Sequence, residues 1–386
     1  MPGRRRALVE YVVEHSLLLA AGAIIAFLWA NSRDAERYYR FAAQLHFIVN
    51  DAGMAFVFAL AAKEIVESIA PGGALHTWRR AALPAVAAAG GMIGPAVIYF
   101  VYVVNEVQPV LLSGWAVPCA TDIAFSYLVA KSIFRQSHPA IPFLVLVAIA
   151  DDAVGLVILA AFYPVGDRHL LAGSLLMAAA IGVSFGLRRA RVTSFWPYVL
   201  AGGTLSWSAL FYGGLHPALA LVPIVPFMPH AARDAGFFVE APGARDTLSR
   251  FERWWKYPVQ IVLFFFGFVN AGVRMGAVGA GTWAVLVAIV VGKPLGIGAT
   301  VALASAAGLR LPAHLGWRDV LVSGFAAGIG FTVALFFAIA AVPPGPILEQ
   351  LKLGALSSVG SGALAFAAAA ILRAGRFSAS RSAGRP

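Results

Sequence analysis

Two adjacent acidic residues stand at the centre of a long apolar run, and they constrain this chain more than any other feature. Residues 141–163 read IPFLVLVAIADDAVGLVILAAFY, with Asp151 and Asp152 near the midpoint. A hydrocarbon core about 30 Å thick is crossed by roughly 20 apolar residues in a helix. A central Asp costs about 2.5 to 3.5 kcal/mol on insertion scales, so two of them indicate a functional requirement. A buried helix of a soluble protein is the alternative, and it is disfavoured because similar apolar runs recur down the whole chain.

The composition indicates a membrane protein. Hydrophobic residues make up 60% and charged residues 12% of the 386 residues, with a mean hydropathy of +0.81, whereas a soluble domain carries about 25% charged residues. The net charge of +11 does not indicate nucleic acid, because the basic residues fall in the loops between apolar runs. The single cysteine, Cys119, excludes a disulfide framework and cysteine metal sites. No ATP-binding motif is present, and we expect neither a cofactor nor enzymatic activity.

The apolar runs predict an all-α polytopic membrane protein with about 12 transmembrane helices. Of the 29 Lys and Arg, 21 fall on one side of the resulting topology and six on the other, with Lys63 and Lys293 inside spans. The positive-inside rule then places the N- and C-termini in the cytoplasm. The expected spans are residues 8–30, 46–66, 83–104, 115–131, 141–163, 169–187, 194–212, 215–228, 258–273, 282–304, 320–342 and 348–372.

Two of these spans are interrupted. Span four carries Pro118, Thr121 and Asp122 in a segment barely long enough to cross, and span eleven is broken by the sequence GIGFT at 328–332. They occupy corresponding places in spans three to five and ten to twelve, which predicts inverted repeats over about 83–163 and 282–372 whose discontinuous helices cross at the membrane midplane. We expect one transporter domain over residues 1–374 and a disordered, basic cytoplasmic tail over 375–386.

Five short motifs resemble the NhaA family of bacterial sodium/proton antiporters, which is itself a known example of the inverted-repeat pattern. They are ATDIAF at 120–125, IADDAVG at 149–155, VNAGV at 269–273, GKPLGI at 292–297 and GIGFT at 328–332. The resemblance covers residues from about 50 to about 362.

The resemblance implies roles for individual residues. Asp151 and Asp152 would bind the transported Na⁺ and the protons, and Lys293 would pair with Asp151 when no ion is bound. Thr121 and Asp122 would lie where the broken helices cross. The ends of half-helices carry partial charges that Asp122 and Lys293 can offset, so Asp122 is either a structural countercharge or a ligand.

The resemblance also implies regulation by pH and shows departures from the family. Glu64, Glu252 and His216 match family positions linked to pH regulation, although residues of these kinds are often simply solvated or interfacial. The basic pair that commonly follows the Glu64 position is absent, and Glu67 stands there. The loop over residues 31–50 is too short for the two-stranded hairpin of family dimers, so a monomer or a weak homodimer is expected.

These features predict a secondary antiporter of the bacterial inner membrane that exports Na⁺ or Li⁺ while protons enter, with one net charge moved per cycle. Membrane lipids are the other expected partners, and nucleic acid is not one. The alternatives are a sodium-coupled symporter of an organic anion and a passive channel. Two buried acids would compete with an anionic substrate, and a channel needs no proton site, so the acidic pair favours antiport. The choice between Na⁺ and K⁺ depends on geometry that the sequence does not show.

Overall fold

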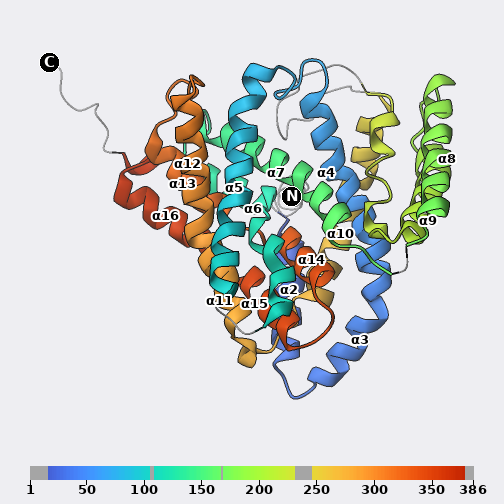
Figure 1. The fold of residues 1–386 in the computed structure, drawn as a ribbon, viewed down its shortest axis with the longest axis horizontal. Helices are drawn as coiled ribbons and strands as arrows, with labels where there is room; N and C mark the ends of the chain where they lie inside the picture. The colour runs from blue at the N-terminus through green and yellow to red at the C-terminus, as the bar shows by residue number, and fades with distance from the viewer. Residues whose placement is uncertain (1–15, 105–107, 167, 231–245, 379–386) are drawn as a thin grey trace, which may run out of the picture. The chain divides into compact units, whose positions relative to one another are not determined.

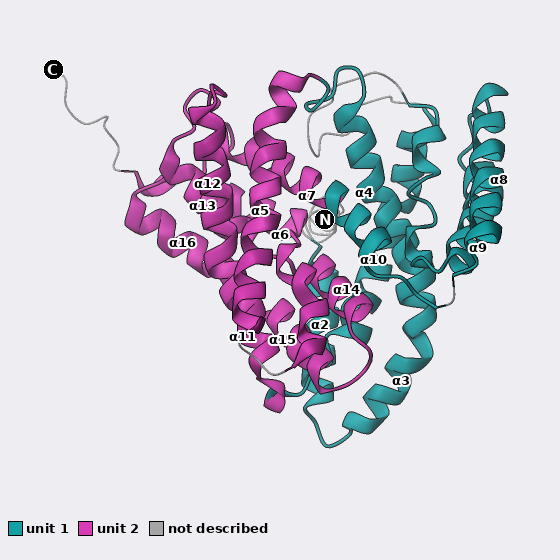
Figure 2. Ribbon diagram, in the orientation of Figure 1, with its two compact units in different colours: residues 1–76, 153–275 teal, residues 77–152, 276–386 magenta. Residues whose placement is uncertain are grey.

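The computed structural model describes residues 16–104, 108–166, 168–230 and 246–378, and every regular element in them is a helix or helical turn (Figure 1). Helices satisfy their own backbone hydrogen bonds, which an apolar chain in a bilayer requires. The contacts divide the chain into two compact units (Figure 2), each built from two separated segments. Unit 1 comprises Met1–His76 and Ala153–Met275, and unit 2 comprises Thr77–Asp152 and Gly276–Pro386.

Unit 1 is organised around α10, which packs against α2 and α4. A Cβ added at Gly22 of α2 would overlap the Phe264 carbonyl of α10, so a glycine is needed for the two backbones to touch. The elements of this unit are α2 (Leu17–Ala30), α3 (Ala35–Phe47), the π turn η1 (Ile48–Gly53), α4 (Met54–Ile69), α8 (Leu170–Arg189), the π turn η3 (Tyr198–Gly203), α9 (Thr204–Gly213), the 3₁₀ turns η4 (Pro217–Leu219) and η5 (Val225–Phe227), and α10 (Thr247–Asn270).

Unit 2 contains residues 83–152 of the first predicted repeat and all of the second, 282–372. Its elements are α5 (Trp78–Val104), the 3₁₀ helix η2 (Pro109–Cys119), α6 (Ile123–Ile133), α11 (Ala280–Val287), the π turn η7 (Ala288–Gly292), α12 (Lys293–Ala306), α13 (Trp317–Ala327), α14 (Phe331–Ala341), α15 (Pro346–Ser357), α16 (Gly360–Leu372) and the 3₁₀ turn η8 (Gly375–Phe377). Two elements contain a boundary between the units along the chain. In the 3₁₀ turn η6 (Met275–Ala277) it follows Met275, and in α7 (Ala140–Phe162) it follows Asp152, so both aspartates of α7 belong to unit 2.

Four glycines bring α5 and α12 into backbone contact, and the two helices lie side by side in Figure 1. A Cβ on Gly94 would overlap the carbonyl of Gly292, and one on Gly296 would overlap that of Gly90. Membrane helices approach this closely only where such small residues face each other. The contact fixes the backbone on both sides of Lys293.

The number of long spans is smaller than the sequence predicts. Six helices of the described residues are long and apolar enough to cross a bilayer, or seven if the bent pair α13 and α14 counts as one. Several expected spans are instead short helices joined to π or 3₁₀ turns, and part of the first lies outside the described residues. The number twelve therefore stays a prediction.

Two local expectations were wrong. The segment 31–50, expected to be a loop, is mostly helical, because α3 begins at Ala35 and continues through η1 into α4. Its polar residues share an amphipathic helix that buries Tyr38 and Ala42, four residues apart. The segment 215–228 is not an α-helix but two 3₁₀ turns, since its three prolines remove backbone donors. The expected tail begins with η8, and residues 379–386 lie outside the described part.

Candidate functional site

The break between η2 and α6 places an aspartate at a helix start. The chain turns extended at Ala120 and Asp122 before α6 begins at Ile123. The Asp122 carboxylate accepts hydrogen bonds from the backbone N–H of Ala124 (3.2 Å) and Phe125 (3.3 Å). It is therefore the N-cap of α6, a position that favours aspartate.

The same carboxylate also caps a second helix. The segment Gly328–Gly330 separates α13 from α14, and the chain bends by 50° between the two helices. Asp122 accepts the backbone N–H of Thr332 at 3.3 Å and its hydroxyl. The N–H of Asp122 donates to the Ile329 carbonyl at 2.6 Å, so the two breaks are joined directly. One negative charge thus meets the partially positive ends of two helices.

Lys293 serves the opposite helix ends. Its side chain is 0% exposed. Its Nζ donates to the carbonyl of Ala120 (2.8 Å), just past η2, and to that of Ala327 (3.1 Å), the last residue of α13. It also donates to the Thr121 hydroxyl. One positive charge therefore meets the partially negative ends of both segments.

Asp151 lies beside this lysine and keeps one oxygen free. Its Oδ2 is 3.4 Å from Lys293 Nζ and accepts the Thr121 hydroxyl at 2.7 Å. That hydroxyl also lies 3.1 Å from the Ala327 carbonyl, and its single hydrogen can serve only one of these acceptors at a time. Oδ1 of Asp151 is buried and has no hydrogen-bond partner among the described residues. Asp152 is half-buried, and its carboxylate has no hydrogen bond or ion pair recorded in the described part of the chain.

The structure thus brings four of the predicted residues together, Thr121, Asp122, Asp151 and Lys293, with Asp152 next to Asp151 on α7. No group of three or more His, Cys, Asp or Glu gathers as a metal-binding cluster in the described residues. A cation at the aspartate pair would accordingly share its oxygen ligands with hydroxyls, carbonyls or water.

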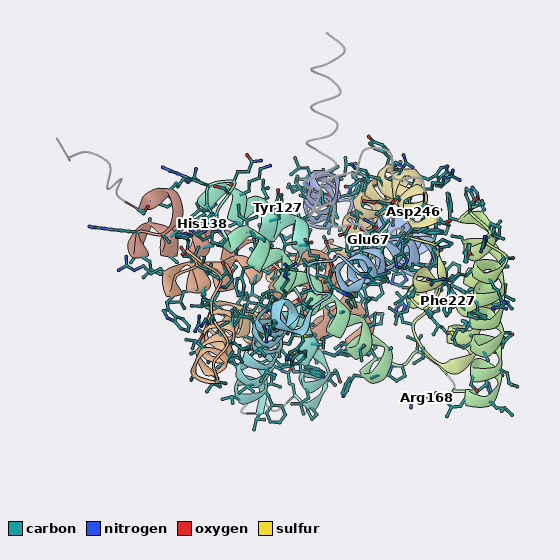
Figure 3. The ribbon with its side chains drawn as sticks, turned by 90° about the horizontal axis from the view of Figure 1, so that it is seen from above. Glu67, Tyr127, His138, Arg168, Phe227 and Asp246 are labelled. Carbon is teal, nitrogen blue, oxygen red and sulfur yellow. The ribbon has the colours of Figure 1, made fainter. Side chains whose placement is uncertain are left out.

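The residues expected to regulate pH response lie in unit 1. Lys63 is 5% exposed, and its Nζ lies 3.2 Å from Glu64, 2.7 Å from Glu67 and 2.9 Å from Glu252. Glu67 can be located on α4 in Figure 3. His216 accepts the backbone N–H of Ala218 (3.3 Å) and so begins η4. The sequence analysis assigned Glu64 and Glu252 to the same regulatory role but not Lys63, which contacts both. The spacing of Lys63 and Glu67, four residues apart, is that of an ion pair on one helix face and could have indicated it.

Hydroxyl groups around the α13–α14 break were also missed. Ser361 donates to the Phe325 carbonyl (2.6 Å), and Ser126 to that of Ala326 (2.9 Å). Ser358 accepts the N–H of Gly330 (3.2 Å). The carbonyls at the end of α13 are consequently satisfied by side chains from other helices, which sequence spacing cannot indicate.

A membrane protein that buries opposite charges between interrupted helices has the architecture of an ion-coupled transporter. The comparisons with known proteins are more specific. The family model described as Na⁺/H⁺ antiporter 1 matches residues 7–372. A Na⁺/H⁺ antiporter NhaA of Geobacter sulfurreducens is 44% identical over 365 residues, covering 92% of this chain and 95% of the relative.

Other relatives and one solved structure agree. The NhaA of Geobacter metallireducens is 44% identical over 378 residues (95% of this chain, 98% of the relative), and that of Desulfitobacterium hafniense is 41% identical over 374 (94% and 96%). The sodium proton antiporter MjNhaP1 of Methanocaldococcus jannaschii has a TM-score of 0.54 at 16% identity, covering 93% of this chain and 95% of that one, which shows the fold alone. The chain belongs to the NhaA Na⁺/H⁺ antiporter family. It is a multi-pass membrane transporter that exchanges sodium for protons.

Proposed function

We propose that Asp151 and Asp152 form the site at which Na⁺ and protons compete. The observation that carries this proposal is that Oδ1 of Asp151 is buried and that neither it nor the adjacent Asp152 carboxylate has a hydrogen-bond partner among the described residues. Carboxylate oxygens are suitable ligands for a hard cation, and each can take a proton instead. Li⁺ is expected to use the same oxygens.

In this proposal Lys293 is the countercharge that occupies the site when no cation is bound. Its distance of 3.4 Å from Asp151 is long for a charge-assisted hydrogen bond, whereas its bond to the Ala120 carbonyl is short at 2.8 Å. A cation could therefore replace the lysine at Asp151 while the lysine keeps its carbonyl partners. Thr121 would bridge the two charges through its hydroxyl.

Asp122 is proposed as a structural countercharge and not as an ion ligand. Its carboxylate already accepts three backbone N–H groups and the Thr332 hydroxyl. A carboxylate offers about four lone-pair sites. These four donors leave little capacity for a cation.

The charges at the proposed site are compatible with electrogenic exchange. The two aspartates and the lysine carry a net charge of minus one when all three are ionised. Each of the two carboxylates can bind one proton, so the site can take up two. If one Na⁺ displaces both, one net positive charge enters per cycle, worth about 2.3 kcal/mol per 100 mV. The membrane potential could then drive Na⁺ export without a pH gradient.

We further propose the membrane organisation that the sequence predicted: about 12 spans in one domain over 1–374, two inverted repeats, interrupted spans crossing at the midplane, and cytoplasmic termini in the bacterial inner membrane. The excess of Lys and Arg in alternate loops supports this topology. The passage of α7 through the division of the two units supports a single domain. Glu64, Glu252 and His216 remain candidates for pH regulation, and a monomer or weak homodimer is expected.

Purified protein in liposomes tests the cation and the coupling together. With a pH gradient imposed, added Na⁺ or Li⁺ should dissipate it, and K⁺ should not. A cation that must displace n protons loses apparent affinity by n decades per pH unit under acidic conditions, so we expect a limiting slope near two. A slope near one, with no current on a supported membrane, would show exchange of a single proton.

A further inference from the structure

A π turn directly precedes Lys293. The turn spans Ala288–Gly292 and joins α11 to α12, and the N–H of Lys293 returns to α-helical spacing by donating to Ile289. A π turn closes its hydrogen bonds over five residues where an α-helix closes them over four. It therefore holds one residue more than a regular helix of the same rotation.

That extra residue decides which way Lys293 points. Gly281 and Val285 lie on the buried face of α11. In an uninterrupted α-helix Lys293 would be rotated by about 120° from Gly281 and about 80° from Val285, because each residue turns the helix by about 100°. With one residue absorbed by the π turn, Lys293 lies within about 20° of both.

Contacts with other helices hold both halves of the helix in place. The N–H of Gly281 donates to the Gln350 side chain of α15 at 3.0 Å, and a Cβ on Gly281 would lie 3.0 Å from Leu111 of η2. Lys293 donates to Ala120, which follows the same η2. On α12, a Cβ on Gly296 would overlap the Gly90 carbonyl of α5. Neither α11 nor α12 can rotate without losing such contacts.

We propose that the π turn Ala288–Gly292 is the positioning element of Lys293. Its additional residue sets the rotation that directs the ammonium group to the carbonyls of Ala120 and Ala327. The expected effect of the π turn on exchange rests on the proposed role of Lys293 in transport. The claim that the π turn sets the direction of the Lys293 side chain does not depend on that role.

This proposal predicts an asymmetry that a regular helix lacks. Deleting one residue from the π turn would convert it to an α-helix and leave the rotation between α11 and Lys293 unchanged. Inserting one residue would rotate Lys293 by about 100°. In a regular α-helix, deletion and insertion each impose a rotation of that size.

The experiment compares deletion of Val291 with insertion of a second valine after it. Val291 is 38% exposed, so its own contacts contribute little. The control is the same pair of changes at Val97, which is 53% exposed and lies in α5, shortly before the buried Tyr99 that donates to the Leu111 carbonyl. The rate and KM for Na⁺ in liposomes and the thermal midpoint in detergent are measured for all four variants.

We expect deletion of Val291 to keep kcat within a few-fold and the insertion to lower it by about 100-fold, as misplaced functional groups do. Both changes at Val97 should lower the thermal midpoint. Equal loss of exchange on deletion and insertion at Val291 would overturn the positioning role.

A second comparison separates this claim from the function of Lys293. Lys293→Ala is combined with each Val291 variant, and the change in midpoint is compared. The lysine substitution should lower the midpoint as much in the deletion variant as in the unaltered chain, and much less in the insertion variant. A shift that disappears in the deletion variant overturns the inference. Unchanged exchange in Lys293→Ala alone would instead overturn the proposed role of the lysine.

Discussion

Unit 1 and unit 2 each bury one lysine among acidic side chains, and the two clusters solve the problem of that charge differently. Lys63 is surrounded by three glutamates whose side chains are about one third exposed, so its charge is overcompensated and partly screened. Lys293 faces one buried carboxylate and relies otherwise on backbone carbonyls and a hydroxyl. The glutamates of the first cluster carry more negative charge than Lys63 neutralises, and water can solvate the excess. In the buried cluster, Oδ1 of Asp151 has no hydrogen-bond partner among the described residues, as the proposed exchange of cations for protons would require.

The largest difference between the clusters should appear when Asp152 is neutralised. Asp152→Asn removes one of the two acidic ligands, so we expect loss of Na⁺-driven proton flux in liposomes with normal insertion into the membrane. Asp151→Asn should also cripple transport. Asp34→Asn, at an exposed aspartate 3.7 Å from Arg37, is the matched control and should be active. Flux like that of the unaltered protein in Asp152→Asn would remove the aspartate pair from the transport site.

The next largest effect concerns stability in the buried cluster. Lys293→Ala leaves Asp151 and the ends of η2 and α13 without a countercharge, and breaking a buried pair in this way costs about 3–5 kcal/mol. We expect a lower thermal midpoint in detergent, with a smaller loss for Lys293→Arg. Lys131→Ala, at an exposed lysine beside the Tyr127 ring, controls for removal of a lysine as such. An unchanged midpoint in Lys293→Ala would argue against its pairing with Asp151.

The smallest effect is expected in the cluster around Lys63 and should depend on ionic strength. Lys63→Ala leaves three neighbouring glutamates to repel one another, at a cost of about 1 kcal/mol because water screens them. Salt screens the repulsion further, so the difference in stability from the unaltered protein should be present at low ionic strength and shrink as salt is added. Thermal midpoints at low and high salt measure it. Lys63→Met keeps most apolar contacts, and if it showed no such salt dependence the repulsion would be excluded.

The charged centre of the site could be located from the sequence, because an ionised group in a membrane-length apolar run is expensive wherever it stands. Asp151, Asp152 and Lys293 are recognisable on that ground alone. Spacing along the chain does not reveal their partners, since the bond from Lys293 to the Ala120 carbonyl joins residues 173 positions apart. Spacing along the chain indicates neighbours on one helix and says nothing about contacts between helices.

The fold was predictable at the level of class, and less so at the level of helix ends. All regular elements in the described residues are helical as expected, and the family assignment is confirmed. The π turns could not be foreseen, because one additional residue in an apolar helix leaves the composition unchanged. The helix α3 is hard to recognise in the sequence because its polar face resembles a loop, and 215–228 has the hydropathy of a span although its prolines exclude a regular α-helix.

The shared capping of the two breaks has a mechanical consequence. Asp122 binds the starts of both α6 and α14, Lys293 binds the ends of both η2 and α13, and a backbone hydrogen bond ties Asp122 to Ile329. Pulling one break away from the other would leave these buried donors and acceptors unsatisfied, at about 1–3 kcal/mol each. We therefore expect the two interrupted segments to move together. In the proposed transport cycle, a hinge that exposes the aspartates to either side of the membrane would then lie outside these two breaks, in the connections that lead into them.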